Sequence, residues 1–139
     1  MVKKQPSCEE EFWEYLDKIK FAKHLKKIEK KLAGKTIVIY GAGAFFQALV
    51  KKYDLSALNI IAISDRKFIN HEDGHSFSGY KVCAPAEIPN LKPDYVLVSM
   101  INFIPVIEDL DETVIKNTGI KLKPLINKPF IELWQEIWS

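Results

Sequence analysis

Lys35-Thr36-Ile37-Val38-Ile39-Tyr40-Gly41-Ala42-Gly43-Ala44-Phe45-Phe46-Gln47-Ala48-Leu49-Val50 is the stretch that decides the fold. β-Branched and aromatic residues run up to Tyr40, which is typical of a strand. Gly41 and Gly43 interrupt that run and helix formers follow, so the stretch predicts a strand, a tight turn and a helix over residues 43–53. Glycine lets a ligand approach the main chain, and the first amide groups of a helix lack partners within it. The turn therefore predicts a phosphate-binding site.

The composition is that of an ordinary globular protein, with 47% hydrophobic and 27% charged residues in a chain of 139. A net charge of +2 is too small to favour nucleic acid or an anionic membrane as the main partner. The only cysteines, Cys8 and Cys83, form no disulfide framework. The sequence has no signal peptide and no apolar run of the roughly 18 residues that span a bilayer. We therefore expect a cytoplasmic protein without a membrane span.

The first 34 residues predict a helical segment. Ser7 and Glu10 have the spacing of a capping box, and apolar residues then recur at intervals of three and four as far as Gly34. This pattern predicts one long helix or two with a bend. Lysines line the opposite face, which is either a solvated surface or a basic surface that docks on an acidic partner or a membrane. We divide the chain into this N-terminal basic amphipathic segment, residues 1–34, and a Rossmann-like nucleotide-binding domain, residues 35–139.

The rest of the chain alternates apolar runs with helical or turn-forming segments. Further strands are predicted at residues 58–64, 80–83, 94–99 and 120–126, helices at 103–117 and 129–138, a loop at 65–79, and at most one helical turn at 84–89. Short alternating elements of this kind favour right-handed βαβ units. We predict an α/β fold with a single Rossmann-like, doubly wound, mostly parallel five-stranded sheet in the order 3-2-1-4-5 and an extra N-terminal helix.

This strand order predicts where a ligand binds. The chain reverses direction between the first strand and the strand at residues 94–99, and ligands bind in the crevice beyond the carboxyl ends of such strands. Asp65 lies about 20 residues beyond the glycine turn, where the dinucleotide fingerprint has an acid that contacts ribose. The candidate ligand-binding residues are Gly41, Ala42, Gly43, Ala44, Phe45, Asp65, Arg66, Ser99, Met100 and Asn102.

Each group of candidates has an expected role. The amides of residues 42–45 are expected to hold phosphate, Asp65 the ribose hydroxyls, and residues 99–102 the distal part of the ligand. Arg66 and the following lysine either contact a phosphate or lie in a solvated loop. The polar residues of 99–102 are either ligand donors or helix caps.

Three features limit the chemistry. Phe46 stands where the fingerprint has a third glycine, which is unfavourable for standard NAD geometry. Residues 71–75 read H-E-D-G-H, but the Asp-Gly pair predicts a turn and no third ligand follows, so we expect a surface loop or lid rather than a zinc site. The motifs of serine hydrolases, P-loop enzymes and short-chain reductases are all missing from the sequence. We assign no catalytic residue and no metal ligand.

Several segments together resemble a known family. They are residues 37–43, IVIYGAG; 61–65, IAISD; 79–82, GYKV; 85–88, PAEI; and 93–99, PDYVLVS. In this order they resemble the small Rossmann-like modules attached to bacterial sugar-nucleotide dehydratases, sugar acyltransferases and other surface-polysaccharide enzymes. The resemblance covers about residues 34–126. It implies that Gly41, Ala42, Gly43 and Asp65 line a pocket for a nucleotide or nucleotide sugar.

The sequence leaves three functions open. The first is an accessory module that binds a nucleotide or nucleotide sugar in surface-polysaccharide biosynthesis. The second is an NAD(P)-dependent sugar-nucleotide oxidoreductase or dehydratase, or a fragment of one, whose reactive residues come from a partner chain. The third is an interaction domain with a vestigial crevice. Trp13, Trp134 and Trp138 are candidates for the surface of a homodimer or of a contact with a catalytic partner domain.

Overall fold

The computed structural model describes residues 6–72 and 74–126. In chain order its elements are α1 (Glu9–Lys18), α2 (Phe21–Lys31), β1 (Thr36–Tyr40), α3 (Ala44–Lys52), β2 (Asn59–Ser64), the 3-10 turn η1 (Arg66–Phe68), β3 (Ser76–Phe77), β4 (Tyr80–Cys83), the 3-10 turn η2 (Pro85–Glu87), α4 (Ile88–Leu91), β5 (Tyr95–Val98), α5 (Phe103–Thr113) and β6 (Lys121–Pro124). The helix predicted at residues 129–138, with Trp134 and Trp138, lies outside the described residues.

The centre of the fold is a six-stranded sheet in the order β3-β4-β2-β1-β5-β6. All neighbouring strands are parallel except β3 and β4. Ile37 and Ile39 of β1 and Val96 of β5 are fully buried, as expected for central strands covered on both faces. The predicted order 3-2-1-4-5 is confirmed, because β4, β2, β1, β5 and β6 are the five predicted strands.

Part of the predicted loop at residues 65–79 is structured, which corrects the expectation. It holds the turn η1 and the short strand β3, which pairs antiparallel with β4 at the edge of the sheet. Ser78 and Gly79 join the two strands, and both have positive φ, 51° and 83°. Two consecutive residues with positive φ are characteristic of a tight two-residue hairpin turn.

The N-terminal segment forms two helices, so the second of the two alternatives is right. Lys20 separates α1 from α2 and adopts a left-handed conformation, with φ of 56°. Phe12 of α1 and Phe21 of α2 are buried in the same apolar cluster as the sheet. The predicted capping box is wrong: Ser7 contacts the carboxylate of Glu11, with its amide at 3.3 Å and its hydroxyl at 3.1 Å.

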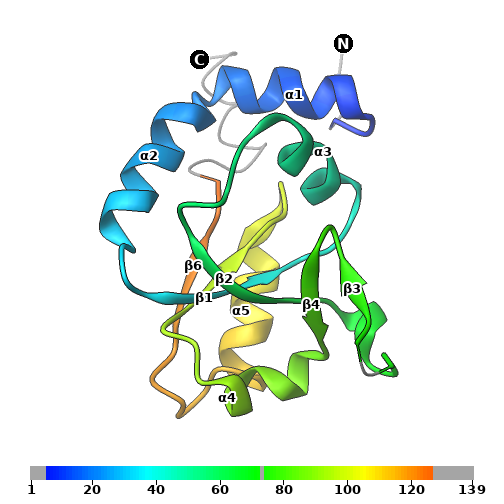
Figure 1. Ribbon diagram of the computed structural model, residues 1–139, viewed down its shortest axis with the longest axis vertical. Coiled ribbons are helices and arrows are strands. Elements are labelled where there is room, and N and C mark those ends of the chain that lie inside the picture. Colours follow the sequence, from blue (N-terminus) through cyan, green and yellow to red (C-terminus); the bar gives the residue numbers. More distant parts are fainter. Residues whose placement is uncertain (1–5, 73, 127–139) are drawn as a thin grey trace.

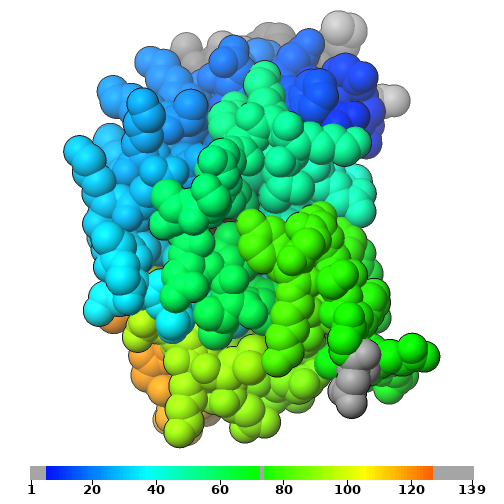
Figure 2. Space-filling model, in the orientation of Figure 1, coloured from blue at the N-terminus to red at the C-terminus, as the bar shows by residue number. Residues whose placement is uncertain are grey.

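Helices cover both faces of the sheet (Figure 1). In that view α1 and α3 lie above the strands, and α4 and α5 lie below them. The blue surface of α1 and α2 forms one end of the molecule, next to α3 (Figure 2). Trp13 is half-buried there, and its indole N–H donates to the carbonyl of Ala48 at 2.8 Å. No helix among the described residues is long and apolar enough to cross a membrane.

Candidate functional site

The glycine turn between β1 and α3 is held tightly against the neighbouring strand. Gly41 has φ of 114°, and a Cβ at this position would lie 2.9 Å from the carbonyl oxygen of Ser99 and 3.2 Å from Cε of Met100. Side-chain-bearing residues rarely adopt such a φ, and no real Cβ makes so short a contact with backbone. Gly41 is therefore required for the close approach of the two strand ends at the carboxyl edge, the edge where β1, β2 and β5 end.

Gly43 is required for neither reason. Its φ of −100° is open to any residue, and a Cβ here would meet no atom within 4 Å. It is the N-cap of α3, and both Gly43 and Ala44 are exposed. The first amides of a helix have no partner within it. No described side chain caps α3, so the positive end of its helix dipole lies at the exposed residues Gly43 and Ala44.

Asp65 contacts the turn directly. One carboxylate oxygen accepts from the amide of Ala42 at 2.8 Å, and the other accepts from the amide of Lys67 at 3.1 Å. Asp65 is thus the cap of η1 and links the end of β2 to the glycine turn. The amide of Ala42, which was expected to hold phosphate, is engaged by this carboxylate, while the amides of residues 43–45 are not.

Two basic side chains follow Asp65 and take different directions. Lys67 reaches back to the turn, where its ammonium donates to the carbonyl of Ala42 and lies 4.5 Å from the ring centre of Phe77. Arg66 extends the other way and pairs with Asp109 of α5 at 3.1 Å. Lys67 therefore places a positive charge beside α3, and Arg66 ties the end of β2 to α5.

Tyr40 is a site residue that the sequence interpretation missed. It ends β1, and its hydroxyl group lies next to Arg66. Burial raises the pKa of Tyr40, and the Arg66 charge opposes that rise. The sequence held one indication that Tyr40 belongs to the site, because Tyr40 is the last residue of the strand before the glycine turn.

The opposite wall of the expected crevice comes from residues 99–102. The amide of Ser99 donates to the carbonyl of Tyr40 at 2.8 Å, and its buried hydroxyl has no partner within the described parts of the chain. Met100 packs its side chain against Gly41. Asn102 occupies the predicted N-cap position of α5 and is exposed, although its side chain makes no capping hydrogen bond. The structure thus brings the two predicted walls together, and Met100 fills the space where they meet.

The two phenylalanines at the start of α3 point into the protein. Phe45 packs edge-to-face on Phe12 of α1, with ring centres 5.4 Å apart. Phe46 is fully buried, and its ring centre lies 6.5 Å from that of Phe77. The large side chain at the third fingerprint position is therefore part of the core and does not cover the exposed amides.

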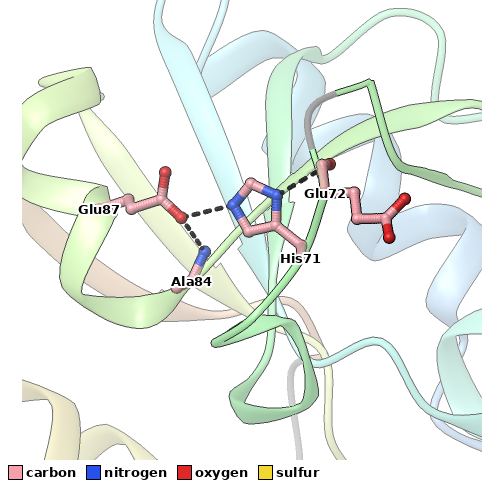
Figure 3. Close-up of polar contacts among 4 residues, drawn as sticks. All are labelled: His71, Glu72, Ala84 and Glu87. Atoms are coloured by element: carbon pink, nitrogen blue, oxygen red, sulfur yellow. Dashed lines mark hydrogen bonds and ion pairs between the residues drawn. The ribbon is translucent and has the colours of Figure 1, made fainter.

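The H-E-D-G-H segment is not helical, and its two imidazoles have different surroundings. Both ring nitrogens of His71 have a partner (Figure 3). Nε2 lies 2.6 Å from the carboxylate of Glu87, and Nδ1 lies 3.3 Å from the carbonyl oxygen of Glu72. The same carboxylate oxygen accepts from the amide of Ala84 at 2.8 Å. These hydrogen bonds, first from the amide and then from the imidazole, lower the pKa of Glu87. The His75 ring instead packs on Phe68, 5.5 Å between centres.

Three surface pockets in the described part of the chain lie away from the glycine turn. One is at the amino edge of the sheet, where β1, β5 and β6 begin, and it is described below. A second lies beside the end of α3, around Tyr53 and Tyr80. The third is formed by the segment that contains His71 and His75, together with Lys67. None of these three pockets is lined by the residues at the start of α3.

Residues 33–121 match the protein family described as C2185-like, N-terminal. The chain belongs to this family. The match runs from just after α2 to the first residue of β6, so the matched part of this chain includes the glycine turn, Asp65 and residues 99–102. Comparison with curated proteins gave no match, and comparison with solved structures gave none.

Proposed function

We propose that this protein binds a nucleotide or a nucleotide sugar at the carboxyl edge, with the phosphate at the N-terminus of α3. The observation that carries the proposal is the uncapped N-terminus of α3, where Gly43 and Ala44 are exposed, next to the ammonium of Lys67. Amide N–H groups at a helix N-terminus and a nearby lysine are the groups that proteins use to hold phosphate.

Asp65 keeps the capacity to bind ribose hydroxyls in this arrangement. Each of its carboxylate oxygens accepts one hydrogen bond from the main chain. An ionised carboxylate offers about four lone-pair positions, so each oxygen can accept one more bond. Asp65 is half-buried rather than enclosed, which leaves it accessible to a ligand lying on α3.

The resemblance to modules of surface-polysaccharide enzymes supports a nucleotide sugar as the ligand and an accessory role in that biosynthesis. The NAD(P)-dependent enzyme is the weaker alternative, because Phe46 occupies the position of the third glycine and the amide of Ala42 is engaged by Asp65. The position of Met100 against Gly41 favours the third alternative, an interaction domain with a vestigial crevice.

One experiment separates these functions. The melting temperature of the full chain is measured with a panel of UDP-sugars, GDP-sugars, NAD and NADP. A ligand that binds only the folded state at 100 times its Kd stabilises it by about 2.7 kcal/mol, which a thermal shift detects readily. We expect a nucleotide sugar to raise the melting temperature. A shift with NAD or NADP alone supports the enzyme, and no shift with any member supports the interaction domain.

A pair of variants then locates the site. Gly43→Val adds a branched side chain beside the exposed amides without a clash, since no atom lies within 4 Å of the Cβ position. We expect it to abolish the ligand-induced shift while the free protein stays folded. Ala57→Val adds similar bulk at an exposed loop position and serves as the matched control. Binding that survives in Gly43→Val would place the ligand elsewhere.

A further inference from the structure

A cavity of about 500 Å³ opens at the amino edge of the sheet. Three separate segments of the chain converge on it: the residue before β1, the end of α4 with the approach to β5, and the start of β6. The cyan, yellow-green and orange surfaces of these segments meet at the lower left of Figure 2. We name this cavity the amino-edge pocket. The parallel strands begin at this edge, whereas the glycine turn lies at the opposite edge, where they end.

The amino-edge pocket is positively charged. Lys35, Lys92 and Lys121 each contribute to its lining, and none of them forms an ion pair with another described residue. The one acid in the lining, Asp94, is engaged by Thr36 through its amide at 2.9 Å and its hydroxyl at 3.2 Å. The pocket therefore carries three positive charges against one negative charge that is already hydrogen-bonded.

Two of these lysines also act on the carboxylate of Asp94. The pKa of Asp94 is lowered, chiefly by the hydrogen bond from the Thr36 amide and in addition by the charges of Lys35 and Lys121. Lys121 also lies over the ring of Tyr95, 5.6 Å from its centre. Positive charges gathered in a concave surface attract anions more strongly than the same charges spread over a flat one.

The main-chain groups of the lining are largely satisfied within the protein. The amide of Lys121 donates to the carbonyl of Asp94 at 3.1 Å, and the amide of Ile120 donates to the hydroxyl of Thr118 at 3.2 Å. The hydroxyl of Thr118 donates in turn to the carbonyl of Ile115. The open polar groups of the lining are therefore the three ammonium groups and one oxygen of Asp94, so donors outnumber acceptors and match a ligand rich in anionic acceptors.

The other lining residues set the size and character of the ligand. Pro89, Pro93 and Ile120 give the pocket an apolar side. Its volume falls within the range of about 300–1,000 Å³ that is common for small-molecule sites, so it is larger than a single inorganic ion requires. Charge on one side and apolar surface on the other fit an organic molecule with a charged end.

We propose that the amino-edge pocket binds a phosphorylated small molecule that carries several negative charges. This site is separate from the one proposed at α3, and neither depends on the other. Lys35, Lys92 and Lys121 hold the phosphate groups, and the prolines contact the uncharged part of the ligand.

The test uses the full chain and inorganic pyrophosphate as the probe, titrated by calorimetry at physiological ionic strength. The variant with Lys92→Gln and Lys121→Gln removes two charges from the pocket. Lys26→Gln with Lys81→Gln removes two exposed charges elsewhere, on α2 and β4. All four positions are surface lysines, and circular dichroism confirms that each double variant is folded.

We expect the pocket variant to weaken pyrophosphate binding about tenfold or more, equivalent to at least 1.4 kcal/mol. All titrations are made in the Gly43→Val background, which removes the phosphate site proposed at α3, so the heat measured comes from the amino-edge pocket. In that background the control variant should bind as the chain with unmodified lysines does. Two results would overturn the proposal: no binding at millimolar pyrophosphate, or an equal loss in the control variant.

Discussion

The two glycines of the turn after β1 should respond in opposite ways to the same substitution. Gly41→Ala places a Cβ 2.9 Å from the carbonyl oxygen of Ser99, at a φ of 114°. That oxygen cannot easily move, because the amide of Ser99 is hydrogen-bonded to Tyr40 within the β1–β5 pairing. Gly43→Ala places a Cβ in open space at a φ of −100°.

The expected magnitudes follow from these contacts. A residue held in a rarely populated backbone region costs about 1–3 kcal/mol, and an extra methyl group in a packed site costs about 1–3 kcal/mol. Gly41→Ala should therefore lower the free energy of unfolding by about 2–6 kcal/mol. Gly43→Ala has two opposing effects: alanine is less favourable than glycine at an N-cap, but it also reduces the conformational freedom of the unfolded chain. We therefore expect the free energy of unfolding to change by no more than about 1 kcal/mol.

Urea unfolding followed by tryptophan fluorescence measures both variants. The slope of unfolding free energy on urea is about 1–3 kcal/mol per M, so a loss of about 3 kcal/mol moves the midpoint by at least about 1 M. A midpoint for Gly41→Ala that matches the unmodified chain would refute the close approach of β1 and Ser99. Equal losses in the two variants would refute the distinction between the glycines.

Two further predictions concern the carboxylates that link the loops of the carboxyl edge. Asp65→Ala leaves two backbone amides without their acceptor and should reduce the free energy of unfolding by about 1–3 kcal/mol. Asp65→Asn retains one acceptor oxygen and should therefore lose less stability. Equal losses of the two variants in urea unfolding would argue against this role of Asp65. The hydrogen bonds from the Ala84 amide and His71 hold the pKa of Glu87 below its ordinary value in the folded protein, so the contribution of Glu87 to stability is present at neutral pH and is lost as the pH falls through that lowered pKa. Unfolding of Glu87→Gln and the unmodified chain should therefore differ most at neutral pH and converge in acid, and a difference independent of pH would contradict the pairing with His71.

The order of the sheet could be predicted from the sequence because its central strands are buried on both faces. Residues 36–40 and 95–98 read as continuous apolar runs, and a glycine turn follows the first. Connections between parallel strands are short and right-handed, which leaves only a few possible strand orders for the sheet. The hairpin of β3 and β4 was missed because β3 has two residues and lies among turn-forming ones. Its signal was present, since Ser78-Gly79 stands between Phe77 and Tyr80 as a tight turn between two aromatic residues.

The predicted site residues lie at the carboxyl edge, but their hydrogen bonds could not be read from spacing. An acid about 20 residues after a glycine turn fits a ribose contact, yet Asp65 bonds to the turn itself. The pair between Arg66 and Asp109 joins residues far apart in the sequence, and only the fold brings them together. Spacing along the chain indicates which residues share an edge, whereas the donors and acceptors that each side chain finds depend on its neighbours in space.

The helices before residue 33 complete the core of the region that matches the family. The family match begins at residue 33, but Leu16 of α1 and Phe21 of α2 are fully buried, and Phe12 packs edge-to-face on Phe45 of α3. The homologous region therefore has an apolar face that it does not cover by itself. A chain truncated to start at residue 33 would leave this face open to water, so α1 and α2 belong to the folding unit although they lie outside the matched region.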